Sequence, residues 1–212
     1  GAYILQMAFY EARGDAGFRE LKMTIDYLRA SHPDIPIISD AKRADMENTT
    51  EQYAAALFDW FGFDAVTLNP YFGKDVLMPF LRRKDKGCFI LCRTTNPGAG
   101  EFQDLSVGGK SLWQIVAEHV RDKWNENGNC MIVAGATYPE ELKKLRGMMG
   151  EMTFLVPGIG PQGGDLEKAI KNGVNAAGKG IIVVVARGVV YADDPGKAAK
   201  EFRDAINRYR GA

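Results

Sequence analysis

The chain has 212 residues, of which 46% are hydrophobic and 25% are charged, so it is long enough for one large globular domain with a sizeable core. Lys and Arg together number 27, as do Asp and Glu, and this balance gives no overall field that would favour nucleic acid or an anionic membrane as a partner. Any anion must therefore be recognised locally.

The three cysteines are an odd number, and two of them, Cys88 and Cys92, lie inside the apolar run CFILC. Free thiols in such a run behave as small hydrophobes, so we expect a reducing, cytoplasmic setting. No apolar stretch approaches the roughly 20 residues that span a bilayer, and no signal peptide precedes the first strand-like segment. The sequence therefore predicts no membrane partner.

Short apolar runs recur along the chain, and each is followed by a longer segment of helical character. The runs are near-continuous rather than alternating, which is typical of strands buried on both faces of a parallel sheet. The predicted strands are 3–9, 35–41, 65–69, 88–94, 130–136, 153–159 and 180–187. The predicted helices, whose apolar residues recur at three- and four-residue spacing, include 16–31, 48–62, 110–125 and 138–150.

This alternation of strand and helix indicates the α/β class and favours a (β/α)8 TIM barrel. An open doubly wound sheet is disfavoured because no glycine-rich dinucleotide fingerprint follows any strand. A complete barrel needs an eighth strand, whereas the sequence shows seven. No linker or composition break marks a second domain, so we expect a single barrel domain over residues 1–212.

Polar or glycine-rich sequence gathers at the predicted strand ends, where this fold carries its catalytic groups. The segments are DAKRAD, NPYFG, RTTNPGAGE, PGIGPQGGD and ARG. In the first, Asp40 and Lys42 stand two residues apart on a strand and so share one face, while Asp45 falls in the following turn. Interleaved charges of this kind favour one another's ionised forms. They are either a catalytic cluster or a surface ion-pair network around a helix N-terminus, with Asp45 and Asn48 as caps.

Two later segments suit an anion. PGIGPQGGD, residues 157–165, places four glycines around Gln162, so the backbone can approach a ligand and the Gln162 side chain can add a donor. A flexible turn is the alternative. Arg187, beside Gly188 at the end of the last predicted strand, is a planar donor suited to phosphate, and the last loops of such barrels commonly hold phosphate.

Three further features carry less weight. Residues 93–103, RTTNPGAGEFQ, combine small hydroxyl and amide side chains with glycine and proline, which suits either a lid over a polar ligand or a plain turn. His32 and His119 do not stand at metal-ligand spacing from cysteines or carboxylates, so no zinc site is expected. The aromatic cluster 59–63 is better explained by a helix packing on the barrel than by base stacking.

Taken in order, the motifs resemble those of the orotidine 5′-monophosphate decarboxylase family, in the branch that carries DAKRAD. The resemblance covers residues 2–210 and rests on AY-LQMAFYEA, DAKRADMENT, TLNPYFG, LCRTTNPGAGEFQDL, VAGATYPEEL, PGIGPQGGD and ARGVVYA. A lone DxKxxD is shared by related phosphate-binding barrels, but the ordered set is strongly specific. The resemblance implies a homodimeric lyase that converts orotidine 5′-monophosphate (OMP) to UMP in pyrimidine biosynthesis, with no cofactor or metal.

The resemblance also implies roles at the pyrimidine and the ribose. Lys42 would protonate C6 of the pyrimidine after carbon dioxide leaves, and Asp40 would sit beside the substrate carboxylate. A fixed ammonium at Lys42 would stabilise negative charge that is absent from the ground state. Asp45 with Thr49 would reach the ribose of the neighbouring site across the dimer interface.

Further positions fall where the family holds the rest of the substrate. Thr95 stands where the family places a hydroxyl residue against the pyrimidine edge. Gln162 and Arg187, with Gly188 beside it, fall at the positions that grip the phosphate. Because the phosphate is remote from the reacting carbon, its binding energy can close the lid and orient the base.

The chain departs from the family pattern in two places. The family has a lysine where this chain has Ile4, so the alternating Lys-Asp-Lys-Asp network is broken. The family also has an earlier strand and helix, so we expect that the N-terminal strand and helix are missing here, which explains the count of seven. Two other functions stay open: a catalytically impaired barrel that still binds UMP, and a metal-dependent phosphosugar synthase or decarboxylase on the same fold.

Overall fold

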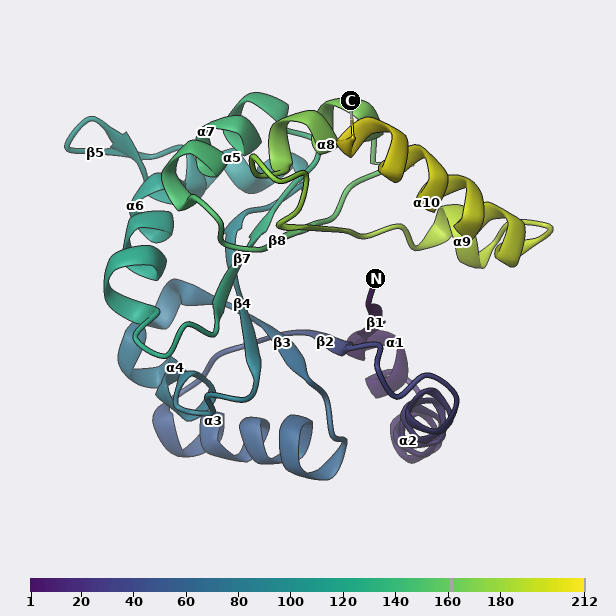
Figure 1. Cartoon of the computed structure of the whole chain (residues 1–212). Coiled ribbons are helices and arrows are strands. Elements are labelled where there is room, and N and C mark those ends of the chain that lie inside the picture. The colour runs from purple at the N-terminus through teal and green to yellow at the C-terminus, as the bar shows by residue number, and fades with distance from the viewer. Residues whose placement is uncertain (161, 212) are drawn as a thin grey trace. The chain divides into compact units, whose positions relative to one another are not determined.

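The computed structural model describes residues 1–160 and 162–211 of the chain (Figure 1). Backbone contacts divide the chain into two compact units. The first comprises Gly1–Leu91 and Trp124–Cys130, and the second comprises Cys92–Lys123 and Met131–Ala212. Strand β4 (Gly87–Arg93) begins in the first unit and ends in the second.

The first unit contains parallel strands in the order β1, β2, β3 and β4. Strand β1 spans Tyr3–Gln6, β2 spans Ile37–Arg43 and β3 spans Ala65–Leu68. The register pairs Gln6 with Asp40 and Ala65 with Gly87. All four residues of β3 are buried, as the near-continuous apolar sequence predicts for a strand covered on both faces.

Helices connect these strands. They are α1 (Met7–Glu11), α2 (Gly14–Ser31), α3 (Glu47–Ala54), the π-helical η1 (Ala55–Trp60), the 3-10 turn η2 (Pro70–Phe72) and α4 (Lys74–Leu81). Helix α2 buries Leu21, Ile25 and Leu28, whose spacing of four and three residues places them on one face. Helices α3 and α4 pack against each other.

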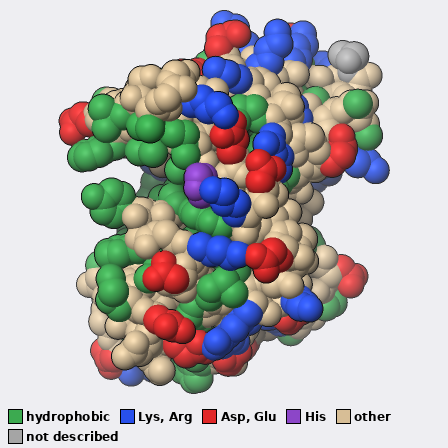
Figure 2. Space-filling model, turned by 90° about the vertical axis from the view of Figure 1, so that its left-hand side faces the viewer, with side chains coloured by type: hydrophobic (Ala, Val, Ile, Leu, Met, Phe, Trp, Pro, Cys, Tyr) green, Lys and Arg blue, Asp and Glu red, His purple; other side chains and the backbone are tan. Residues whose placement is uncertain are grey.

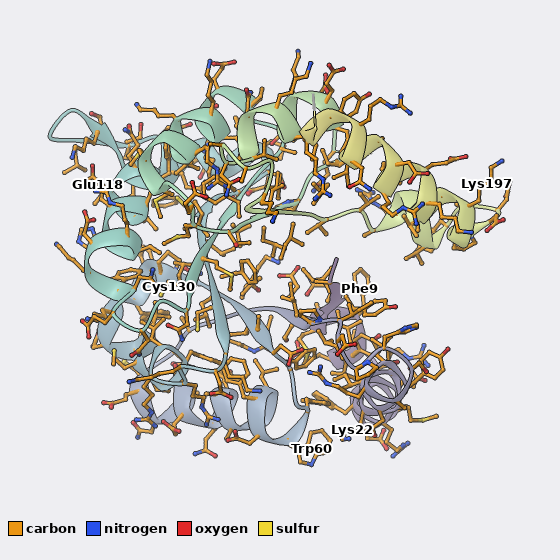
Figure 3. The ribbon with its side chains drawn as sticks, viewed as in Figure 1. Phe9, Lys22, Trp60, Glu118, Cys130 and Lys197 are labelled. Carbon is orange, nitrogen blue, oxygen red and sulfur yellow. The ribbon has the colours of Figure 1, made fainter. Side chains whose placement is uncertain are left out.

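The aromatic cluster at the end of η1 is divided between core and surface. Phe61 and Phe63 are buried, whereas Trp60 projects outward and is 58% exposed (Figure 3). The rings of Trp60 and Phe61 meet edge to face, with centroids 4.4 Å apart. The cluster therefore contributes mainly to packing, as its sequence indicates.

The second unit contains β7 (Cys130–Ala134), which starts at the last residue of the first unit, together with β8 (Phe154–Val156) and β9 (Ile181–Val183). These strands are parallel, and Phe154 pairs with both Ile132 and Ile181. A separate antiparallel hairpin consists of β5 (Ser106–Val107) and β6 (Lys110–Ser111). Its two turn residues, Gly108 and Gly109, both have positive φ, which suits a two-residue hairpin loop.

The helical elements of the second unit are η3 (Pro97–Ala99), α5 (Gly100–Gln103), α6 (Leu112–His119), η4 (Val120–Trp124, whose last residue belongs to the first unit), α7 (Pro139–Met149), α8 (Leu166–Gly173), α9 (Arg187–Val190) and α10 (Pro195–Arg210). Helix α8 packs against both α7 and α10 (Figure 1). None of the helices in the described part of the chain has both the length and the apolar character needed to cross a membrane.

The seven predicted strands are all present, and the parallel order β1-β2-β3-β4-β7-β8-β9 confirms the α/β prediction. Several strand ends were predicted wrongly; β8, for example, stops at Val156 rather than residue 159. The first strand stops at Gln6 rather than residue 9, because the Gln6 side chain accepts the N–H of Ala8 and caps α1. The last strand stops at Val183, so Arg187 begins α9 instead of ending a strand. A Cβ on Gly188 would lie 3.4 Å from the ring of Phe202, which is an ordinary van der Waals distance.

Candidate active site

The carboxylate of Asp40 is the centre of a hydrogen-bonded cluster formed by the first three strands. Its Oδ1 accepts hydrogen bonds from Nζ of Lys42, at 2.6 Å, and from Oγ1 of Thr67, at 2.9 Å. Its Oδ2 accepts one from Nε2 of Gln6, at 2.7 Å. The Asp40 side chain is 20% exposed and that of Lys42 is 47% exposed. The ammonium of Lys42 is therefore tethered at one N–H while remaining accessible to a ligand.

The backbone of Lys42 has an unusual conformation. Its φ is 50°, and no other non-glycine residue among 1–160 and 162–211 has a positive φ. The N–H of Lys42 donates to Oγ1 of Thr67 at 2.9 Å. Side chains with a Cβ rarely occupy this region, and such conformations cluster at functional sites.

Asp45 is hydrogen-bonded within the turn that leads into α3. Its carboxylate accepts the N–H of Met46 at 2.7 Å. Thr50, which is fully buried, donates its hydroxyl to the C=O of Asp45 and accepts the N–H of the same residue. The structure thus brings Asp40 and Lys42 together and binds Asp45 into the start of α3, where Thr49 is exposed. The N-cap of α3 is Met46 rather than Asp45 or Asn48.

In the second unit, glycines make room for Thr95 just beyond β4. A Cβ on Gly135, directly after β7, would lie 2.6 Å from Cγ2 of Thr95, and a Cβ on Gly158, after β8, would lie 2.8 Å from it. Gly158 also has a φ of +105°, which favours glycine. The N–H of Gly135 donates to the C=O of Arg93 at 2.8 Å. Close backbone approach at these two strand ends therefore fixes the position of Thr95.

The glycine-rich segment after β8 folds back on itself. The N–H of Gly164 donates to the C=O of Gly158 at 3.0 Å, and the N–H of Gly163 donates to the C=O of Gly160 at 2.8 Å. Residue 161 of this segment lies outside the described residues. Gln162 is exposed in the turn, and Arg187 is exposed at the first position of α9. Both side chains are therefore accessible to a ligand.

The segment after β4 has a fixed base and an exposed tip. Arg93, whose side chain is 3% exposed, lies over the ring of Tyr138 at 3.8 Å and pairs with Asp104 at 3.1 Å. Oε1 of Gln103 accepts the N–H of Thr94 at 3.0 Å, and Nε2 of Gln103 donates to the hydroxyl of Thr94 at 2.8 Å. Residues 96–98 at the tip are exposed. Whether this tip acts as a lid stays a prediction.

Sequence reasoning missed three residues that organise the cluster: Gln6, Thr50 and Thr67. Gln6 reaches Asp40 because β1 and β2 pair in a register that places the two residues side by side. Thr67 is a lone hydroxyl within the apolar strand AVTL, which is the one signal the sequence offered. Within the described residues, no three His, Cys, Asp or Glu side chains are grouped in a way that could hold a metal ion.

Comparison with known proteins identifies the lineage. The model of the family described as Orotidine 5'-phosphate decarboxylase / HUMPS matches residues 3–202 of the chain. The chain belongs to this family. An orotidine 5'-phosphate decarboxylase of Azoarcus sp. (strain BH72) is 46% identical over 212 residues, which cover 97% of this chain and 78% of that protein. One from Janthinobacterium sp. (strain Marseille) is 47% identical over 197 residues, which cover 90% of this chain and 73% of that protein.

Solved structures agree with this assignment to the orotidine 5'-phosphate decarboxylase family. Leishmania donovani UMP synthase has a TM-score of 0.96 at 42% identity, and the match covers 100% of this chain and 47% of that longer chain. Leishmania donovani OMP decarboxylase has a TM-score of 0.93 at 40% identity, with 100% of this chain and 81% of that chain covered.

Membership of the family confirms the resemblance drawn from the ordered motifs and the (β/α)8-barrel fold predicted with it. It also confirms the prediction of a carbon–carbon lyase of pyrimidine biosynthesis. The family description covers two groups, but curated relatives at 42–47% identity are named orotidine 5'-phosphate decarboxylase. The phosphosugar alternative is therefore disfavoured.

Proposed function

We propose that this chain decarboxylates OMP with Lys42 as the proton donor to C6 and Asp40 as the group that orients it. The observation that carries the proposal is the Asp40–Lys42 pair, which is held by hydrogen bonds from two neighbouring strands. The bond between C6 and the carboxylate carbon breaks, its electron pair stays on C6, and carbon dioxide leaves. One N–H of Lys42 then delivers its proton to C6, which gives UMP and a neutral amine that regains a proton from water.

The ammonium of Lys42 serves this reaction electrostatically as well as chemically. Negative charge on C6 develops only as carbon dioxide leaves, so a preorganised positive charge stabilises the transition state more than the ground state. Asp40 holds the ammonium through one oxygen, so the ammonium does not have to reorganise during the reaction. Turnover of OMP by the purified chain tests the proposal, and Lys42→Ala should reduce that turnover by about 10³-fold or more.

We further propose that Thr95 contacts the pyrimidine edge and that Gln162 and Arg187, with Gly188 beside it, hold the phosphate. The accessibility of Gln162 and Arg187 supports this assignment, as does the fixed position of Thr95 between two glycine backbones. Arg187→Ala should weaken UMP binding by about 2 kcal/mol or more, because charge-assisted hydrogen bonds to phosphate are lost. Calorimetric titration with UMP measures this, and an unchanged affinity would remove Arg187 from the site.

A homodimer is part of the proposed function. Met46 is 55% exposed, and residues 47–49 at the start of α3 are exposed as well, so this segment is available to a second copy of the chain. Asp45 and Thr49 would then serve the ribose of the neighbouring site. On the face shown in Figure 2, acidic and basic side chains are interspersed, and we propose neither nucleic acid nor a membrane as a partner. Three free, buried cysteines suit the proposed cytoplasmic setting.

A further inference from the structure

We propose that Thr67 is a positioning residue that holds both the backbone of Lys42 and the carboxylate of Asp40. The proposal rests on the proposed function of Lys42 and extends it to a residue that need not touch the substrate. Thr67 lies on β3 and is 1% exposed. Its single hydroxyl accepts the N–H of Lys42 and donates to Oδ1 of Asp40, both at 2.9 Å.

The strand pairing explains why a side-chain hydroxyl is needed here. Ser39 pairs with Val66 and Arg43 pairs with Leu68, so β2 advances four residues while β3 advances two. The extra residues form a bulge, in which Lys42 leaves the regular ladder and adopts its φ of 50°. Oγ1 of Thr67 takes the place of a backbone acceptor for the Lys42 N–H. Without that acceptor the N–H would lose its protein partner, which is unfavourable in a partly buried strand.

The direction of the two hydrogen bonds is fixed by chemistry. A peptide N–H can only donate, and an ionised carboxylate can only accept, so the hydroxyl must accept from Lys42 and give its one proton to Asp40. The same Oδ1 of Asp40 also accepts from Nζ of Lys42. Thr67 therefore fixes the start of the Lys42 side chain and the carboxylate that holds its end. Valine has the same shape but can supply neither hydrogen bond, whereas serine can supply both.

The test compares kinetics of Thr67→Val and Thr67→Ser with those of the unchanged chain. Thr67→Val should lower kcat for OMP by about 10- to 100-fold, because a small displacement of a catalytic group costs this much. UMP affinity should stay within about twofold, since Thr67 does not hold the phosphate. Thr67→Ser should keep kcat within about threefold of the unchanged chain. Thr24→Val is the matched control, because the Thr24 hydroxyl donates to the C=O of Glu20 within α2.

A second measurement separates this proposal from the proposed function. In protein labelled with ¹⁵N-lysine, the Lys42 amide should exchange with solvent at least about tenfold faster in Thr67→Val than in the other forms. If the unchanged chain does not turn over OMP, the proposed function fails, and amide exchange alone decides whether Thr67 positions Lys42. Full kcat in Thr67→Val overturns the positioning role. If the valine form does not fold, the serine form decides, and loss of kcat in that form overturns it as well.

Discussion

Ile4 lies on the same face of β1 as Gln6, two residues before it, and it pairs with Ile38 while Gln6 pairs with Asp40. A lysine at position 4 would therefore extend toward the Asp40 cluster from the neighbouring strand. The amide of Gln6 already binds Oδ2 of Asp40, so the carboxylate is satisfied without a second ammonium. What the isoleucine cannot supply is a second positive charge among the aspartates and a donor for the ribose.

Ile4→Lys should raise kcat/KM for OMP by about tenfold or more, which corresponds to about 1.4 kcal/mol of transition-state stabilisation. The added ammonium would restore the alternation of charges and strengthen contacts to the ribose. Steady-state decarboxylation measures the effect, and Ile4→Met controls for side-chain length without charge. Equal rates for the lysine and isoleucine forms, or a faster isoleucine form, would show that the cluster does not need this lysine.

The strand ends of the second unit position Thr95 by close approach of backbone. Gly135→Ala should destabilise the protein by about 1–3 kcal/mol, because the new Cβ would lie 2.6 Å from Cγ2 of Thr95. Thr95→Ser removes Cγ2, so the double variant should recover at least about half of that loss. Urea unfolding of the two single variants and the double variant gives the coupling energy. Strictly additive effects would mean that Gly135 is required for another reason.

The strands were predictable from the sequence because each is a short apolar run, and the Asp40–Lys42 pair was predictable because alternate residues of a strand share a face. The contacts of Asp40 with Gln6 and Thr67 were not, because they depend on strand register and on a bulge that no local pattern encodes. The π-helical ends of the predicted helices 48–62 and 110–125 were missed for a similar reason. Their apolar spacing is that of an ordinary helix.

At the scale of the whole molecule, the proposed dimer predicts that two inactive variants of the chain can restore each other's activity. If Asp45 serves the neighbouring site, Lys42→Ala and Asp45→Ala should each be nearly inactive. Mixed at equal concentration and allowed to exchange subunits, they should regain about a quarter of the unchanged activity, because half of the dimers are hybrids and each hybrid has one intact site. Sedimentation at micromolar concentration checks that dimers form. No recovery despite confirmed exchange would place Asp45 in its own subunit's site.

The central claim is that the ammonium at position 42 supplies the proton to C6. This claim can be tested by removing the ammonium and then restoring it chemically on a cysteine, because the native cysteines of the protein do not interfere. Lys42→Cys removes the ammonium, and alkylation with 2-bromoethylamine restores one on a thioether of nearly the same length. Burial raises the pKa of Cys92 to about 12 and that of Cys130 to about 11, and it also raises the pKa of Cys88. At about pH 8.5 the exposed thiol introduced by Lys42→Cys therefore reacts while the native cysteines stay protonated.

The measurement is the rate of OMP decarboxylation by the Lys42→Cys protein before and after aminoethylation. The cysteine form should be slower than the unchanged chain by about 10³-fold, and the aminoethylated form should recover to within about tenfold of the unchanged rate. Alkylation with iodoacetamide, which adds a neutral group, should restore nothing. An unmodified cysteine form as fast as the unchanged chain would contradict the account. An aminoethylated form that is folded and binds UMP but stays inactive would contradict it equally.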